Sequence, residues 1–263
     1  MREVKILIEL LDQKAKLVAM LAPSFPIVYK PEVIVGKLKR LGFEFVVEVA
    51  SGARKTNEKV VEVLKKDENA RFITSPCPSF VRMIRTKYPH LKKYLAFAAD
   101  SPMVATAKMV AEKYPGFRPV FIGPCVAKKF ESSEDYPNLN ILVLTYKEMD
   151  EVFKHFGFGD NPNDVGSEFD ISQPQTRLYP ISGGLAESSG LKELLAEDRY
   201  EVISGWEQCE EAIKRFDKNK DIRLLDILFC DGGCINGPGI ESKLSLDERR
   251  DKVIDFWKKD QKE

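Results

Sequence analysis

Short apolar runs alternate with amphipathic stretches along most of the chain. The apolar runs have the length and the β-branched content of buried strands, and the clearest are KLVAMLAPSF, FEFVVEVAS, PVFIGPC and LLDILFC. Between them, stretches such as 31–41, SPMVATAKMVAEKY and SLDERRDKVIDFWKK repeat apolar residues at helical spacing. Strands that alternate with helices favour parallel sheets built from βαβ units, so the predicted fold class is α/β.

Local signals refine the ends of these elements. Thr56 is predicted to cap the helix TNEKVVEVLKK, and Ser245 is predicted to cap the C-terminal helix. The polar loop GFGDNPNDVGSEFD interrupts the pattern. We therefore expect a single domain over 1–263 with two lobes, approximately 16–156 and 173–263, each a mostly parallel sheet flanked by helices.

Three of the five cysteines stand at predicted strand ends, and a fourth follows shortly after one of them. ITSPC ends on Cys77, FIGPC ends on Cys125, and ILFC ends on Cys230; Cys234 follows in a glycine-rich loop. In open α/β sheets the carboxyl ends of parallel strands converge on a ligand. We therefore expect these thiols to form one metal site, in the cleft between the lobes, rather than to fill the core. Cys209 lies within a helical pattern and is interpreted as a packing residue.

The spacing of the thiols leaves two kinds of metal open. Structural zinc usually has two closely spaced ligand pairs, but here only Cys230 and Cys234 are close in sequence. An iron–sulfur cluster accepts more dispersed ligands because it is itself a large template. The two histidines, His90 and His155, lie in helical patterns away from the cysteines and are expected at the surface.

Composition narrows the function classes. The 41 basic and 41 acidic residues give no net charge, which argues against a nucleic-acid partner. The start MREVKILIELLDQKAK lacks an uninterrupted apolar stretch, and no run reaches the roughly 20 apolar residues of a membrane span. A cytoplasmic protein without disulfides or a membrane partner is the expectation.

Three segments resemble the three signatures of the H-cluster domain of FeFe (iron-only) hydrogenases. TSPCPSF resembles T-S-C-C-P-x-W, GPCVAKKFE resembles M-P-C-x-x-K-x-x-E, and LFCDGGCINGPG resembles M-A-C-x-x-G-C-x-x-G-x-G. They occur in the family's order, with further matches at LAPS and SGGLAES. The resemblance covers about residues 16 to 240 and favours an iron–sulfur cluster over zinc.

The resemblance implies a definite site. A 4Fe-4S cluster would be held by Cys77, Cys125, Cys230 and Cys234, and the Cys234 sulfur would bridge to a two-iron subsite with CO and CN ligands. Lys128 occupies the position of the cyanide-binding lysine, and it is both the implied catalytic residue and part of the cofactor site. The family's loop of further hydrogen-bond donors corresponds to Ala22, Pro23 and Ser24. The implied partners are a ferredoxin-like electron carrier and the H-cluster maturation proteins.

Several positions depart from the family pattern. Pro76 replaces the cysteine that relays protons, and Gly123 and Leu228 replace methionines. Met103 stands for a glutamine, and Lys59 stands near the position of a relay glutamate. This combination resembles the sensory groups and the short single-domain members, so we expect a pocket poor in polar groups and a low turnover.

Three functions remain open at this stage. The first is a slow hydrogenase that interconverts H2 with protons and electrons. The second is a sensor module that reports hydrogen or redox state through the same cofactor. The third is an assembly or scaffold protein that carries a 4Fe-4S cluster without the two-iron subsite. No ferredoxin-like run of cysteines precedes the three signatures, so an enzyme of this kind needs an external electron carrier.

Overall fold

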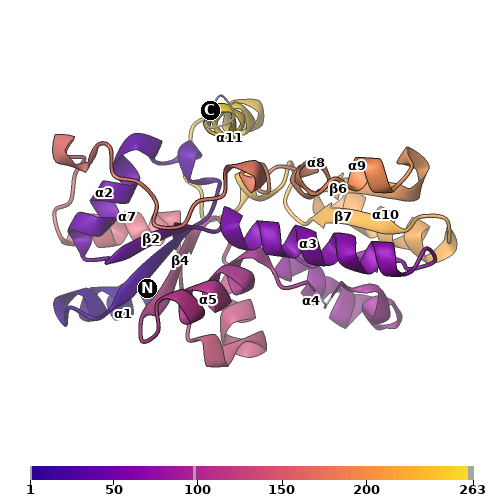
Figure 1. Cartoon of the computed structure of the whole chain (residues 1–263), viewed down its shortest axis with the longest axis horizontal. Coiled ribbons are helices and arrows are strands. Elements are labelled where there is room, and N and C mark those ends of the chain that lie inside the picture. Colours follow the sequence, from indigo (N-terminus) through magenta and orange to yellow (C-terminus); the bar gives the residue numbers. More distant parts are fainter. Residues whose placement is uncertain (1, 97–98, 260–263) are drawn as a thin grey trace.

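The computed structural model describes residues 2–96 and 99–259, whose strands form two parallel sheets (Figure 1). One sheet has four strands in the order β2-β1-β4-β5, and the other has three in the order β3-β7-β6. The strands are β1 (Leu17–Leu21), β2 (Phe45–Glu48), β3 (Phe72–Ile73), β4 (Arg118–Gly123), β5 (Leu142–Thr145), β6 (Tyr200–Ser204) and β7 (Leu224–Leu228). All strand pairs are parallel, so the α/β class predicted from the alternating pattern is confirmed.

Helices cover the sheets. They are α1 (Arg2–Asp12), α2 (Pro31–Leu41), α3 (Ala50–Lys66), α4 (Pro78–Lys87), α5 (Pro102–Lys113), α6 (Lys128–Phe130), α7 (Tyr146–His155), α8 (Gly184–Ser189), α9 (Leu191–Leu194), α10 (Trp206–Lys218) and α11 (Leu246–Lys259). Within the described ranges, none of them is both long enough and apolar enough to cross a bilayer. The predicted cap of α11 is present, because the Glu248 N–H donates to Ser245 Oγ at 3.3 Å.

The four-stranded sheet is built around a strand that is apolar on both faces. All five residues of β1 are buried, which is the pattern of a central strand covered by helices on both sides. On one side of the core, α1 contributes Val4 and Leu7. Each fully buried aliphatic side chain of this kind stabilises the fold by about 1.5–3 kcal/mol.

The three-stranded sheet takes strands from both halves of the chain. β3 pairs with β7 through Phe72 and Leu224, and α4 packs against the same core. The lobes expected at 16–156 and 173–263 therefore interleave, since β3 and α4 lie in sequence between β2 and β4 of the four-stranded sheet. α3 covers the three-stranded sheet, where Val60 and Leu64 belong to one apolar cluster with Leu224.

The start of α3 differs from the prediction. Thr56 was expected to cap this helix, but α3 begins at Ala50 and Thr56 lies inside it, with its hydroxyl donating to Gly52 O at 3.1 Å. The first turn of the helix packs closely against α5. A side chain at Gly52 would lie 2.2 Å from Pro102 O, so α5 approaches α3 more closely than any larger residue permits.

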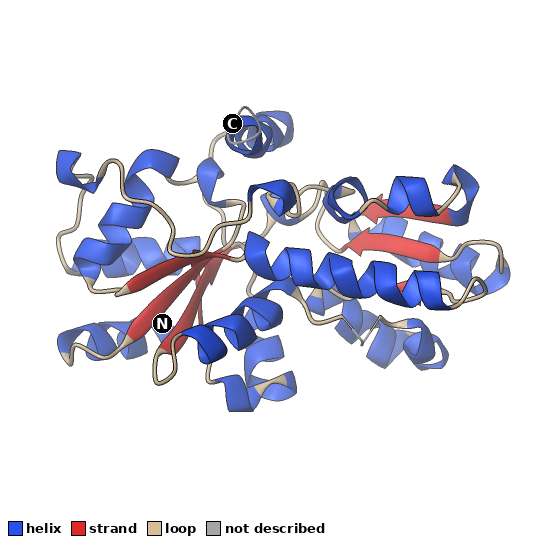
Figure 2. Ribbon diagram, in the orientation of Figure 1, coloured by secondary structure: helices blue, strands red, loops and turns tan. Residues whose placement is uncertain are grey.

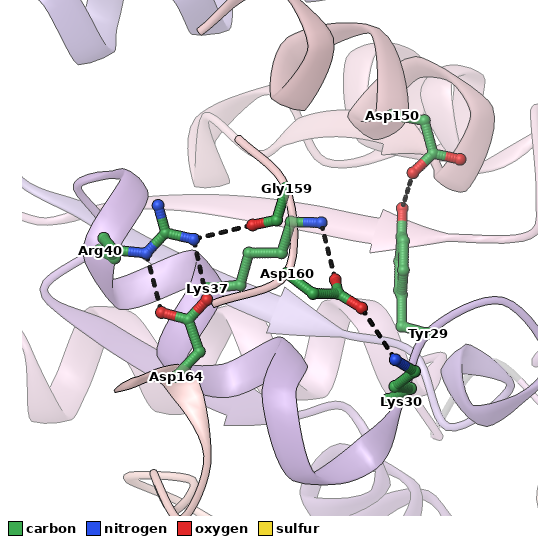
Figure 3. Close-up of polar contacts among 8 residues, drawn as sticks. All are labelled: Tyr29, Lys30, Lys37, Arg40, Asp150, Gly159, Asp160 and Asp164. Carbon is green, nitrogen blue, oxygen red and sulfur yellow. Dashed lines mark hydrogen bonds and ion pairs between the residues drawn. The ribbon is translucent and has the colours of Figure 1, made fainter. Parts of the chain in front are cut away.

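The polar loop that was expected to separate the lobes is fastened onto α2 (Figure 3). Arg40 binds both carboxylate oxygens of Asp164 at 2.8 Å, and Asp160 accepts from Lys37 at 3.3 Å. The backbone comes so close that a Cβ at Gly36 would lie 2.3 Å from Asp164 O. A bidentate arginine–carboxylate pair of this geometry orders the loop.

The carboxyl ends of both sets of strands face the middle of the molecule (Figure 2). Residues that follow β1 and β4, and Leu228 at the end of β7, line one shared pocket there. The two-sheet architecture thus directs three strand ends to a common site, as the position of the cysteines predicts.

Candidate metal centre

The four strand-end cysteines come from three separate segments. Cys77 is the residue before α4, four positions after β3 ends. Cys125 follows β4 by two residues, Cys230 follows β7 by two residues, and Cys234 begins a short 3-10 turn. All four are free thiols; Cys77 is buried and the other three are partly buried.

The electrostatics of the thiols show that they share one region. Burial raises the pKa of Cys125 to about 11 and that of Cys230 to about 12. Burial also raises the pKa of Cys234 well above its usual range, and negative charge on Cys77, Cys125 or Cys230 raises it further. Without a bound metal the thiols stay protonated near neutrality, so a metal must displace those protons when it binds.

Backbone amides are directed at two of the sulfurs. Desolvation raises the pKa of Cys77, but the N–H groups of Phe229, Phe80 and Ser79 lower it. The amides of Lys128 and Ala127 do the same for the pKa of Cys125. Hydrogen bonds of this kind stabilise thiolate charge and are typical of the surroundings of metal-bound cysteines.

The cysteine sulfurs interact electrostatically although they come from separate segments. Among residues 2–96 and 99–259, no three histidine, cysteine or acidic side chains are grouped closely enough to hold one metal ion. The sulfurs nevertheless influence one another's pKa values. A multi-iron cluster accepts ligands from separate segments, because its own size bridges them.

A small pocket of about 70 Å³ adjoins Cys125 and Cys234. Its walls are the residues Ala22, Pro23, Ser24, Val49, Ala53, Pro76, Pro102, Met103, Phe121, Pro124, Cys125, Lys128, Tyr179, Pro180, Leu228 and Cys234. We call this space the cysteine pocket. Most of its wall is apolar, in agreement with the prediction of a pocket poor in polar groups.

Lys128 is a buried cation on this wall. Its side chain is 9% exposed, and Nζ donates to Glu131 Oε2 at 2.6 Å and to Pro76 O at 3.1 Å. It also lowers the pKa values of Cys77, Cys125 and Cys234. The charge of Lys128 is therefore held beside the thiols and away from solvent.

The loop at Ala22, Pro23 and Ser24 lines the pocket as expected, but its hydrogen bonds point elsewhere. The Ser24 hydroxyl lies 2.8 Å from Tyr146 Oη, and that phenol donates to Ala22 O at 3.0 Å. The Ala22 N–H donates to Ile122 O at 2.9 Å. Tyr146, which the sequence reasoning missed, follows the end of β5 and therefore belongs to the same edge of the sheet.

The substituted positions surround the pocket. Pro76, Met103 and Leu228 are on its wall. Gly123 lies beside it, where an added Cβ would lie 2.5 Å from the ring of Phe121. The Phe121 ring therefore occupies the space that a methionine at Gly123 would need. No feature of the local sequence marks Phe121 for this role, because strand apolar residues look alike.

The remaining candidates lie where they were expected. Cys209 is fully buried in the core of the three-stranded sheet, with its sulfur 3.4 Å from Leu228 O. His90 and His155 are exposed. Lys59 forms a surface ion pair with Glu62 at 2.7 Å.

Comparison with known proteins gives one family. The model described as "Iron only hydrogenase large subunit, C-terminal domain" matches residues 15–238. Similar proteins include the cytosolic Fe-S cluster assembly factor NAR1 of Encephalitozoon cuniculi (strain GB-M1), 28% identical over 191 residues, covering 64% of this chain and 52% of that protein. Iron hydrogenase 1 of Clostridium pasteurianum is 24% identical over 256 residues, covering 77% of this chain and 44% of that protein. The chain thus spans about half the length of these relatives.

Solved structures share the fold. An apo [FeFe]-hydrogenase HydA1 variant from Chlamydomonas reinhardtii aligns with a TM-score of 0.74 at 20% identity, over 96% of this chain and 88% of that one. A structure from a study of [FeFe]-hydrogenase oxygen inactivation aligns with a TM-score of 0.70 at 18% identity, with the same coverage of both chains. At such identities the likeness concerns the fold alone.

Proposed function

The chain belongs to the iron–sulfur family of the iron-only hydrogenase large subunit, C-terminal domain, and we propose that it is a slow hydrogenase. The family assignment holds because the family model spans residues 15–238. In this proposal it interconverts H2 with protons and electrons. The observation that carries it is that Cys125, Cys234 and the buried Lys128 line one pocket. Negative charge on Cys77 or Cys230 also raises the pKa of Cys234. The activity goes beyond family membership, since the family also has a relative named as an assembly factor.

The residues fit a cluster with an attached two-iron subsite. Cys77, Cys125, Cys230 and Cys234 would hold a 4Fe-4S cluster, and the cysteine pocket beside Cys234 would take the two irons with CO and CN ligands. When bound, this group supplies the metal sites that split H2 and pass on its electrons. The amides near Cys77 and Cys125 would stabilise the thiolate ligands.

Lys128 has one donor left for such a ligand. An ammonium carries three N–H bonds, and those to Glu131 and Pro76 O occupy two of them. The third can donate to an anionic ligand such as cyanide in the pocket. The Glu131 carboxylate balances the charge of Lys128, so the cation can remain buried before the ligand binds.

Infrared spectroscopy of anaerobically matured protein tests the proposal. Bands of bound CO and CN are expected, together with iron beyond four atoms per chain for a full H-cluster. Lys128→Met should keep the brown iron–sulfur colour and lose these bands. A fully iron-loaded wild type that shows no diatomic bands would contradict the proposal.

Two related functions have their own support. The relative named as an Fe-S cluster assembly factor favours a scaffold that carries only a 4Fe-4S cluster, and the same infrared spectrum separates it from the hydrogenase. The apolar wall around Pro76 and Met103 favours a sensor that keeps the full group. For a sensor, the bands would respond to H2 while turnover stays far below that of catalytic relatives.

The proposed partners are a ferredoxin-like electron carrier and the H-cluster maturation proteins. Cys125 is partly exposed, and beside it Val126 and Phe130 expose 45% and 49% of their surface. An apolar surface next to a redox centre suits a transient electron-transfer contact. Val126→Asp with Phe130→Asp should slow turnover with ferredoxin and leave turnover with a small viologen dye unchanged. A double variant that turns over with ferredoxin as fast as the wild type would exclude this contact.

A further inference from the structure

Tyr179 carries a buried hydroxyl at the edge of the cysteine pocket. It lines the pocket, its side chain is only 7% exposed, and within residues 2–96 and 99–259 its Oη has no hydrogen-bond partner. Buried phenol groups normally find one, so this hydroxyl is available to water or to a transferred proton. Ser24 and Lys128, on the same pocket wall, already make hydrogen bonds within the protein.

A buried acid lies in the neighbouring strand β7. Asp226 is 2% exposed in the central strand β7, and its Oδ2 accepts from the Ala186 N–H at 3.2 Å. Burial raises its pKa to about 6, and its charge in turn raises the pKa of Tyr179. Ala186, which holds this carboxyl, packs in the same apolar cluster as Tyr179, so a group that can gain or lose a proton near neutrality lies within electrostatic range of the phenol.

Thr56 links this buried pair to the outside. Its hydroxyl favours the ionised form of Tyr179 and so lowers the pKa of the phenol. The one hydroxyl hydrogen of Thr56 has two alternative acceptors, Asp100 O at 2.8 Å and Gly52 O at 3.1 Å. Thr56 also lines a surface groove between α3 and α5, together with Glu58, Glu62 and Glu112. We call it the α3–α5 groove.

The wall between the cysteine pocket and this groove is thin. Ala53 of α3 lines the pocket, and Thr56, three residues further on, lines the groove. On α5 the change is equally abrupt, from Met103 in the pocket to Ala105 in the groove. Residues three apart on a helix are neighbours, so the wall is about one helical turn, or roughly 5 Å, thick.

We propose that Tyr179 and Thr56, with Asp226 as a buried proton-holding acid, relay protons between the cysteine pocket and the α3–α5 groove. This inference rests on the proposed function, and it supplies the route that Pro76 and Lys59 cannot provide. Pro76 has no titratable group, and Lys59 lies on the surface in an ion pair with Glu62.

The transfer is balanced. Each H2 yields two protons and two electrons, and the electrons leave one at a time to an external one-electron carrier. A proton from the pocket is taken up at Tyr179 Oη while the phenol passes its own proton to Thr56. Alternatively, Asp226 first holds the incoming proton and gives it to Tyr179 Oη as the phenol passes its own proton on. The Thr56 hydroxyl releases one to a groove carboxylate or to water, so both hydroxyls end as they began. In the direction of H2 formation the same hops run inward.

Deuterium uptake by Asp226 tests the relay without any cofactor. The cluster-free full chain is mixed with D2O at about pH 5, where this carboxyl is protonated, and the infrared C=O band of the acid is followed in time. Asp226→Asn identifies the band by removing it. Tyr179→Phe and Thr56→Val should each slow the uptake several-fold, because each removes one hydroxyl and keeps the side-chain shape.

Two matched variants control for loosened packing. Tyr200→Phe changes a tyrosine that packs against the same apolar cluster as Tyr179, and Thr86→Val changes a threonine with the same bond to the fourth preceding carbonyl. Neither should alter the uptake. Unchanged uptake in both relay variants, or equal slowing in the controls, would overturn the relay. If Tyr179→Phe does not fold, Thr56→Val tests the outer end by itself.

The loaded protein gives a second readout. Tyr179→Phe should lower H2 turnover on the order of a hundredfold and increase the solvent isotope effect, with the infrared bands of the resting cofactor unchanged. If no diatomic bands ever form in the wild type, the proposed function fails while the uptake result still stands. If the bands form and Tyr179→Phe turns over normally, the relay fails and the function stands.

Discussion

Lys128 and Glu131 form a buried ion pair whose members depend on each other. Their side chains are 9% and 8% exposed, and 2.6 Å separates Nζ from Oε2. Taking both charges out of water is costly, and the pair offsets that cost only while both partners remain. A family position that looks like an isolated cofactor ligand in the sequence is thus part of a two-residue unit in the fold.

Lys128→Met is expected to destabilise the cluster-free protein by about 3 kcal/mol, because it leaves the Glu131 carboxylate buried without its cation. Lys128→Met combined with Glu131→Gln should recover most of that loss, since no buried charge is left. Guanidinium unfolding of the three proteins measures both steps. Lys59→Met, which breaks an exposed pair, serves as control and should change little. Strictly additive effects of the two buried substitutions would show that the pair is not coupled.

Asp226 gives a pH dependence of known sign. Its pKa is raised from 3.8 to about 6 in the folded protein, so between these values the unfolded chain has already released the proton that the folded chain retains. Raising the pH through this window therefore favours unfolding, and the loss is complete above about pH 6. Asp226→Asn should remove that loss and gain at most about 3 kcal/mol at pH 7 relative to wild type. Unfolding curves from pH 4 to about 7 measure the difference, and a variant whose stability runs parallel to the wild type would contradict the assignment.

At the scale of elements, the alternation of strands and helices was predictable because it depends on local spacing. The helix at 31–41 and the strand-to-helix passage at β5 and α7 follow from periodicity alone. The membership of β3 in the three-stranded sheet could not be predicted, because the pairing of Phe72 with Leu224 joins distant segments. The cysteines and Lys128 of the site were predictable because they lie in local sequence motifs. Tyr146, Tyr179 and Asp226 reach it only through tertiary packing.

The end of β4 shows how one element compensates for a substitution. The family pattern has methionine where this chain has Gly123, and the ring of Phe121 fills that volume. Gly123→Met should therefore destabilise the protein by about 1–3 kcal/mol, because the new side chain and the ring compete for one space. Gly123→Met with Phe121→Ala should regain part of the loss. Thermal unfolding of both variants measures this, and a single variant as stable as wild type would show that the ring moves freely.

At the scale of the whole molecule, the four cysteines connect the two sheets. Cys125 follows β4 of the four-stranded sheet, whereas Cys77, Cys230 and Cys234 follow β3 and β7 of the three-stranded sheet. A group bound by all four is therefore a cross-link between sheets that otherwise meet through loops and helix packing. Binding to the folded chain alone must stabilise it by mass action.

Cluster loading is accordingly expected to raise the free energy of unfolding by about 4 kcal/mol when the site is saturated a thousandfold above its dissociation constant. Cys125→Ala should abolish most of that gain, because it removes the ligand contributed by the four-stranded sheet. Cys209→Ala is the matched control: it deletes a buried thiol that is not at a strand end, and should cost about 1 kcal/mol with or without the cluster. Anaerobic guanidinium unfolding, with iron determined per chain, distinguishes them. If Cys125→Ala kept both iron and stability, the two sheets would not be joined through the thiols named here. If Cys209→Ala lost the iron, the fifth cysteine would have to be counted among the ligands.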